Sequence, residues 1–173
     1  METARYSASE RRIHVAAGTL GTTAGLALGL ALAGERVEIA ATRITSRLVT
    51  NERALAALVH GASSILQRAG IDVPAPATIS SSVTFVHDQI GAGYGRSTDA
   101  AQDAIARFTD AGLVLDTTYT AKAAAALIAD PLTAAGGTLF LHTLSALEPT
   151  AAAAHITRAN MPHQIATYIT DDI

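Results

Sequence analysis

The stretch from Val15 to Gly34 constrains the fold more than any other part of this 173-residue chain. Twenty consecutive residues carry no charge, and glycines recur at every fourth position from Gly21 to Gly29. Such a run is long enough to cross a bilayer as one helix, and the glycine spacing is typical of packed membrane helices. It is also compatible with a strand, a glycine-rich turn and a buried helix.

The order of residues within the run favours the second interpretation. A β-favouring segment comes first, a turn rich in glycine and threonine follows, and helix-forming residues come last. Five glycines and three threonines also make the run a poor membrane span. We therefore predict a central parallel strand over Ile13–Ala17, a turn over Gly18–Thr22 and a buried helix over Thr23–Ala33. A single membrane helix remains the alternative.

The rest of the chain repeats this alternation of short apolar strands and helices. The pattern predicts strands over Val37–Thr42, Val83–Val86, Leu113–Leu115 and Thr138–His142. It predicts helices over Thr50–Ala69, Thr98–Ala111 and Ala121–Ala129, with Thr50 as a helix cap, and loops over Ile71–Ser82 and Gly91–Gly95. Alternating strands and helices imply a parallel sheet covered on both faces. We expect an α/β fold, a three-layer sandwich with a mainly parallel sheet.

Composition excludes several classes of function. The chain has no cysteine, which rules out disulfides and thiolate metal sites and suits a cytoplasmic location. Its formal net charge is −3, and its basic residues form no stripe, so we expect neither a nucleic-acid partner nor a bound metal. The arginines and acidic residues before the apolar run argue against a secretory signal.

The turn over Gly18–Thr22 has the features of an anion site. A turn between a parallel strand and a helix presents unpaired N–H groups at the helix N-terminus, where a phosphate binds well. Its glycines allow the ligand to approach the main chain, and its threonine hydroxyls add donors. Gly25 and Gly29 are interpreted as sites of close packing between helix and sheet. A glycine-rich turn without any ligand is the alternative.

Four motifs in order resemble one family of pyridoxal-phosphate (PLP) enzymes. They are Ala17-Gly-Thr-Leu-Gly-Thr-Thr-Ala-Gly-Leu26, Gly91-Ala-Gly-Tyr-Gly95, Leu115-Asp-Thr-Thr-Tyr-Thr-Ala-Lys-Ala123 and Leu139-Phe-Leu-His-Thr143. Together they resemble the aminocyclopropane-carboxylate deaminase and D-cysteine desulfhydrase family, which has the tryptophan-synthase-β-like fold, fold type II. The resemblance implies that residues 1–143 are most of a PLP-binding large domain and that 144–173 are a divergent C-terminal tail. Ala121, Leu144 and Ser145 stand where the family has glycines.

The resemblance also assigns site residues. It implies a cradle for the cofactor phosphate made of Gly18, Thr19, Leu20, Gly21 and Thr22. It places Tyr119 against the pyridine ring as a catalytic residue, and Thr120 and Thr143 near the ring nitrogen. Tyr94 either walls the site or covers it. Without the resemblance, Tyr119 and His142 would be interpreted as core residues.

The implied activity is that of a PLP-dependent lyase or deaminase acting on a small amino acid. A carboxylate at the Thr120 position would hold the ring nitrogen protonated, whereas a hydroxyl leaves it closer to neutral. This favours D-cysteine desulfhydrase-like β-elimination over ring opening of the aminocyclopropane-carboxylate deaminase type. The intact family implies a homodimer.

The family's Schiff-base lysine and smaller domain precede the phosphate-loop strand, which here begins about a dozen residues after Met1. We therefore expect an incomplete chain: a fragment, a split-gene product that pairs with a separate N-terminal half, or a decayed relative. A non-catalytic pseudoenzyme or phosphate-binding domain remains the alternative. Lys122, the only lysine, is not expected to form the Schiff base.

Overall fold

The computed structural model describes residues 11–134, 137–144 and 161–163. Its sheet has four strands in the order β3-β2-β1-β4, and every pairing is parallel. The strands are β1 (Arg12–Ala17), β2 (Glu38–Arg43), β3 (Val83–Val86) and β4 (Thr138–Phe140). The predicted central position of the first strand is confirmed. Most of the predicted tail over 144–173 lies outside the described residues.

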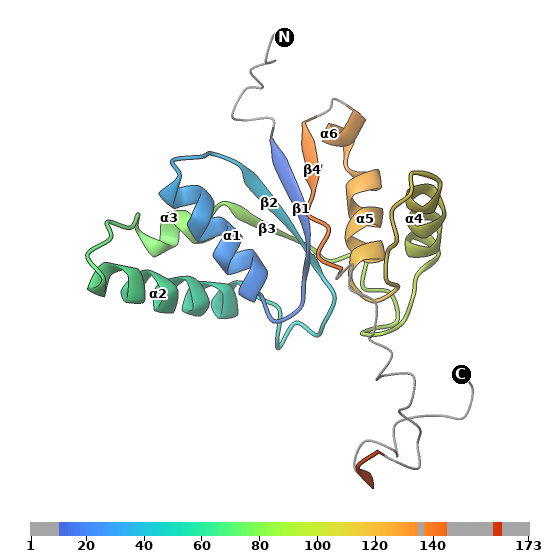
Figure 1. Ribbon diagram of the computed structural model, residues 1–173, viewed down its shortest axis with the longest axis horizontal. Coiled ribbons are helices and arrows are strands. Elements are labelled where there is room, and N and C mark those ends of the chain that lie inside the picture. Colours follow the sequence, from blue (N-terminus) through green and yellow to red (C-terminus); the bar gives the residue numbers. More distant parts are fainter. Residues whose placement is uncertain (1–10, 135–136, 145–160, 164–173) are drawn as a thin grey trace.

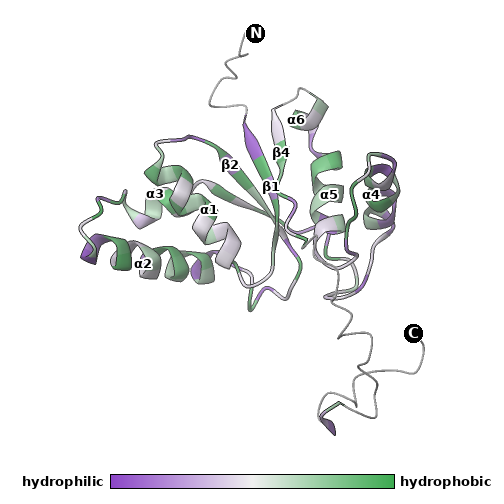
Figure 2. Cartoon of the chain, in the orientation of Figure 1, coloured by the Kyte–Doolittle hydropathy of each residue, from purple (hydrophilic) through white to green (hydrophobic). Residues whose placement is uncertain are grey.

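Helices cover both faces of this sheet (Figure 1). On one face lie α1 (Gly21–Leu32), α2 (Glu52–Arg68) and α3 (Pro76–Ser80); on the other lie α4 (Asp99–Asp110) and α5 (Thr120–Ala129), with the short α6 (Pro131–Ala134) after it. One apolar cluster joins β1, β2, α1 and α2, and a second joins α4 and α5. Hydrophobic residues dominate α5 and the middle of β1 (Figure 2). The predicted three-layer α/β sandwich is confirmed.

The apolar run over Val15–Gly34 folds as a strand, a turn and a helix. β1 ends at Ala17 and α1 begins at Gly21, two residues earlier than predicted. No helix in the described part of the chain is long and apolar enough to cross a bilayer. The interpretation of Gly25 and Gly29 as close-packing positions is wrong, because both are exposed and an added Cβ would meet nothing within 4 Å.

The helix caps require two corrections. Thr98, predicted as the first residue of a helix, is instead the cap of α4, and its hydroxyl accepts the Ala101 N–H at 3.1 Å. Asn51, not Thr50, caps α2, because its side-chain oxygen accepts the Ala54 N–H at 2.9 Å. Thr50 is buried instead, and its hydroxyl donates to the Gly18 carbonyl at 2.6 Å. Thr50 therefore holds the turn after β1 rather than the start of a helix.

Two predicted segments differ in the structure. Leu113–Leu115 forms no strand. Leu115 packs into the second apolar cluster, whereas Val114 is 72% exposed. The predicted loop over residues 71–82 contains α3, which Pro76 begins at its first helical position. Both segments are short, so the tertiary packing decides their conformation.

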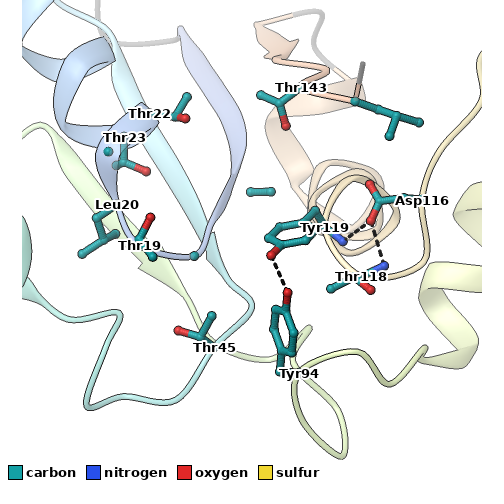
Figure 3. A pocket seen from close by; sticks show the side chains of 14 residues that line it. Thr19, Leu20, Thr22, Thr23, Thr45, Tyr94, Asp116, Thr118, Tyr119 and Thr143 are labelled. Carbon is teal, nitrogen blue, oxygen red and sulfur yellow. Dashed lines mark hydrogen bonds between the residues drawn. The ribbon is translucent and has the colours of Figure 1, made fainter. Parts of the chain in front are cut away.

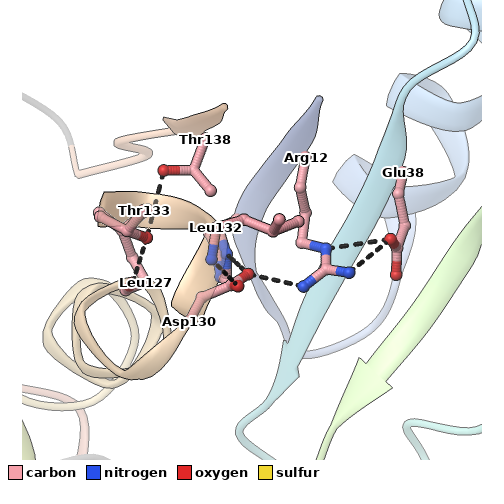
Figure 4. A network of polar contacts seen from close by, with 8 residues as sticks. Arg12, Glu38, Leu127, Asp130, Leu132, Thr133 and Thr138 are labelled. Atoms are coloured by element: carbon pink, nitrogen blue, oxygen red, sulfur yellow. Dashed lines mark hydrogen bonds and ion pairs between the residues drawn. The ribbon is translucent and has the colours of Figure 1, made fainter. Parts of the chain in front are cut away.

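A partly buried charge network closes the amino-terminal edge of the sheet (Figure 4). Arg12 donates to Glu38 at 2.7 Å and to Asp130 at 2.7 Å, and His14 donates to Asp130 at 2.9 Å. Burial lowers the pKa of His14, and this outweighs the attraction of Asp130. Burial raises the pKa of Asp130 less than its hydrogen bonds from Leu132, Arg12 and His14 lower it. This network lies at the amino ends of the strands, opposite their carboxyl ends.

Candidate functional site

A cavity of about 920 Å³ opens at the carboxyl ends of the parallel strands (Figure 3). This is the edge at which open α/β sheets bind ligands. The lining comes from five parts of the chain: the end of β1 with the turn into α1, the segment after β2, the glycine-rich loop (residues 90–96), the turn before α5, and the segment after β4. The lining residues are Ala16, Gly18, Thr19, Leu20, Gly21, Thr22, Thr23, Thr45, Tyr94, Asp116, Thr118, Tyr119, Thr143 and Leu144.

The turn after β1 supplies one wall of the cavity. Leu20 adopts a left-handed conformation with φ 68°, the only such non-glycine residue described, and its side chain is buried in the core. This conformation is costly for a leucine and turns the chain sharply into α1. The first N–H groups of an α-helix have no partner within the helix, and the first residues of α1 line the cavity. The Thr23 hydroxyl is buried beside them without a hydrogen-bond partner.

A second turn presents Tyr119 at the start of α5. The Asp116 carboxylate accepts the N–H groups of Thr118 and Tyr119 through Oδ1, at 2.9 and 2.6 Å. Its Oδ2 accepts the Thr120 N–H at 3.0 Å and the Thr120 hydroxyl at 2.6 Å. Burial raises the pKa of Asp116, but these four hydrogen bonds outweigh burial and lower it overall. Asp116 thus stays ionised and fixes the backbone that carries Tyr119.

Tyr119 and Tyr94 form a hydrogen-bonded pair at the cavity wall. Their hydroxyl oxygens lie 2.6 Å apart, and their rings meet edge to face with centroids 5.9 Å apart. The hydrogen bond from Tyr94, with a smaller contribution from burial, raises the pKa of Tyr119. Tyr119 therefore keeps its proton at neutral pH. A Cβ added to Gly18 would lie 3.5 Å from Tyr119 Cε1, so the tyrosine closes over the turn.

The structure brings together nearly all of the residues assigned from the sequence. Gly18–Thr22, Tyr119 and Thr143 line the one cavity. Thr120 does not line it, since it is 1% exposed and its hydroxyl is bonded to Asp116. His142 lies outside the lining and donates to the Val114 carbonyl at 2.8 Å.

Sequence reasoning missed Asp116, Thr118, Thr23 and Thr45 as lining residues. For Asp116 a signal existed, because an aspartate three or four residues before a helix start is typical of a side chain that caps backbone N–H groups. The other three carry no signal of their own. Within the described ranges, no three His, Asp or Glu side chains gather into a set that could hold a metal ion.

Lys122 lies outside the cavity lining as well. Its side chain is fully buried, and its ammonium donates to the carbonyls of Ile90 at 2.8 Å and Gly93 at 3.0 Å. Burial lowers the pKa of this ammonium.

Fold and cavity together define an open parallel α/β domain whose cavity lies at the carboxyl edge of its sheet, beside the turn between β1 and α1. Comparison with solved structures shows which known proteins share this fold. The chain is similar to the crystal structure of an ACC (aminocyclopropane-carboxylate) deaminase homologue, with 27% sequence identity and a TM-score of 0.60. The chain is a structural relative of the aminocyclopropane-carboxylate deaminase family, whose members use PLP.

The match covers 81% of this chain and 41% of the solved one. The chain thus spans about two fifths of the length of the structure that it resembles. No protein-family model matches the chain, and no curated protein matches it.

Proposed function

We propose that the cavity is the phosphate and ring site of a PLP-dependent enzyme acting on a small amino acid. The observation that carries the proposal is the meeting of the Gly18–Thr22 turn and Tyr119 in one cavity, in a chain related to a PLP-dependent family. A helix N-terminus supplies donors for a phosphate, and an aromatic side chain opposite it suits a planar ring.

The residues present fit this cofactor. The Thr23 hydroxyl is a buried donor without a partner, and it lies beside the free N–H groups of α1. Thr19 and Thr22 are exposed at the mouth of the turn and can add two more hydroxyl donors. Gly18 has no side chain to stand between the turn, Thr45 and Tyr119, where an added Cβ would be in contact with both neighbours. A dianionic phosphate would satisfy all of these donors.

When bound, PLP supplies an electron sink that stabilises negative charge developing on the amino acid. The protein's own residues bind and orient. The cradle at Gly18–Thr22 holds the anion, and Thr143 lies across the cavity from it. Tyr119 holds a proton on its hydroxyl, shared with Tyr94, and can donate or accept it at the reacting centre.

The proposed reaction is β-elimination of the D-cysteine desulfhydrase type, with an aminocyclopropane-carboxylate deaminase-like reaction as the other member of the class. The resemblance places a hydroxyl, Thr120, rather than a carboxylate at the ring-nitrogen position, which favours elimination only if Asp116 does not take that position, because Thr120 itself does not line the cavity. Asp116, bonded to the Thr120 hydroxyl at 2.6 Å, is the member of this pair that lines the cavity. A comparison of Thr120→Val with Asp116→Asn therefore tests which of the two side chains is the partner of the ring nitrogen.

A second function has its own support. The sole lysine of the chain is buried against two backbone carbonyls and does not line the cavity. A non-catalytic domain, or one subunit of a split enzyme, would bind PLP or phosphate through the cradle without covalent attachment. We propose this as the behaviour of the 173-residue chain by itself.

Titration of the chain with PLP and with inorganic phosphate, followed by ³¹P NMR, tests the site. We expect saturable binding of both and competition between them. Borohydride reduction with peptide mapping then tests covalent attachment, and assays with D-cysteine and with 1-aminocyclopropane-1-carboxylate test turnover. We expect no stoichiometric pyridoxyl group on Lys122 and no turnover by this chain alone. Absence of any saturable phosphate binding would refute the proposed site.

A further inference from the structure

Lys122 is the largest fully buried side chain among the residues described. It lies in the first turn of α5, three residues after Tyr119. Burial of an ammonium is costly unless its protons find acceptors. An aliphatic side chain of similar length would fill the same space without that cost. What the ammonium adds is therefore its pair of hydrogen bonds to Ile90 and Gly93.

Those two carbonyls belong to consecutive turns of the glycine-rich loop. The Ile90 carbonyl also accepts the Gly93 N–H, and the Gly93 carbonyl also accepts the Arg96 N–H, both at 3.3 Å. The bonds from Lys122, at 2.8 and 3.0 Å, are shorter than the bonds that close the turns themselves. One ammonium thus joins two turns to the start of α5.

The loop has little else to fix its conformation. Gly91, Gly93 and Gly95 all have positive φ, and glycine has many accessible conformations in the unfolded chain. Tyr94 lies within the second turn, is 58% exposed, and reaches the Tyr119 hydroxyl at 2.6 Å. A single hydrogen bond between exposed side chains holds a flexible loop only weakly.

We propose that Lys122 is a positioning residue whose ammonium holds the glycine-rich loop against the start of α5 and so sets Tyr94 against Tyr119. Lys122 and Tyr119 lie one turn apart on the same helix. The start of α5 therefore places Tyr119 at the cavity and the Lys122 ammonium against the loop. The loop in turn carries Tyr94, whose hydroxyl is hydrogen-bonded to that of Tyr119. The catalytic importance of the tyrosine pair rests on the proposed function, whereas the arrangement itself exists without any ligand.

The first measurement uses the unaltered chain. Because Lys122 is the only lysine, ¹⁵N-lysine labelling gives a single ammonium signal in the NMR spectrum. We expect ammonium protons that exchange slowly enough to be observed at neutral pH, with cross-peaks to protons of the Ile90–Gly93 segment. An ammonium that exchanges as fast as that of free lysine would overturn the proposal, whatever any variant does.

The second measurement compares Lys122→Met, which keeps most of the length of the side chain and removes its donors, with Ile128→Met in the last turn of the same helix. In Lys122→Met we expect the Gly93 and Arg96 amides to exchange about tenfold faster or more. We also expect loss of the cross-peak between the rings of Tyr94 and Tyr119. Amides of β1 and α2 should be unchanged in both variants, and Ile128→Met should leave the loop unchanged.

Tyr94→Phe tests whether Lys122 orders the loop or the tyrosine pair does. It removes the hydroxyl pair but leaves the hydrogen bonds of Lys122, so we expect the loop amides to keep their exchange rates. Unchanged loop exchange and a retained ring cross-peak in Lys122→Met would refute the positioning role. Failure of phosphate binding would leave these results standing, so the two proposals fail separately.

Discussion

Replacement of Gly18 by alanine is expected to change ligand affinity and the free energy of unfolding in different directions. The Gly18 backbone does not have positive φ, so an alanine can adopt the same conformation without strain. Its Cβ would lie 3.5 Å from Tyr119 Cε1 and 3.9 Å from Thr45 Cγ2, which are ordinary contact distances. Both neighbours line the cavity, so the new methyl group would occupy space beside the anion cradle.

The expected magnitudes follow from this geometry. Alanine restricts the unfolded chain more than glycine does, so the free energy of unfolding should rise by about 0.4–1 kcal/mol. If the methyl group displaces a phosphate oxygen from one charge-assisted hydrogen bond, about 1.5–3 kcal/mol of binding is lost. The Kd for phosphate or PLP should then rise about ten- to a hundredfold. Stability and affinity should therefore change in opposite directions.

Urea denaturation and ³¹P NMR titration measure the two quantities. Gly25→Ala is the matched control, because Gly25 is exposed on α1 and an added Cβ meets nothing within 4 Å. We expect it to stabilise the chain by about 1 kcal/mol and to leave the Kd unchanged. A Gly18→Ala chain that binds phosphate as tightly as the original would refute the assignment of this turn as the cradle.

Three further predictions concern other parts of the molecule. Thr50→Val leaves the Gly18 carbonyl without its donor at 2.6 Å, so urea denaturation should show a loss of about 1–3 kcal/mol; a loss below about 0.5 kcal/mol would contradict this role. Burial lowers the pKa of His14, so its contribution to stability is complete above the ordinary histidine value and is lost as the pH falls below it. His14→Gln should flatten the fall in unfolding free energy between about pH 8 and pH 5, and an unchanged slope would count against it. Borohydride treatment with PLP should leave Lys122 unmodified, and a stoichiometric adduct there would show that its burial is not maintained.

Much of the fold could be predicted because its signals are local. Strand β1, the turn and α1 follow the order of residue types between Ile13 and Ala33, and the structure has them within two residues of their predicted bounds. The meeting of Thr143 with the turn also follows, since carboxyl ends of parallel strands share one edge. Tyr119 reaches the same cavity from the turn before α5, without the strand that was predicted before it. The roles of these residues in binding and catalysis stay predictions.

The errors arise where the sequence does not say what a side chain will contact. Thr50 and Asn51 are both good helix caps, and only the position of the Gly18 carbonyl makes Thr50 serve the turn instead. Leu113–Leu115 is apolar enough for a strand but has no neighbouring strand to pair with in the structure. Spacing placed Gly25 and Gly29 on one helix face, but it does not say that this face is turned to solvent.

Lys122 illustrates the same limit in chemical terms. A lysine beside Tyr119 in a PLP-related chain invites assignment as the nucleophile, and burial lowers its pKa as a nucleophilic amine requires. Yet loss of the proton would weaken the two bonds to Ile90 and Gly93, and attack on a ligand would break both bonds. The side chain would also have to leave a fully buried position for a cavity that it does not line. The same contacts that make Lys122 a poor nucleophile make it suitable for holding the loop, so the two roles exclude each other at this residue.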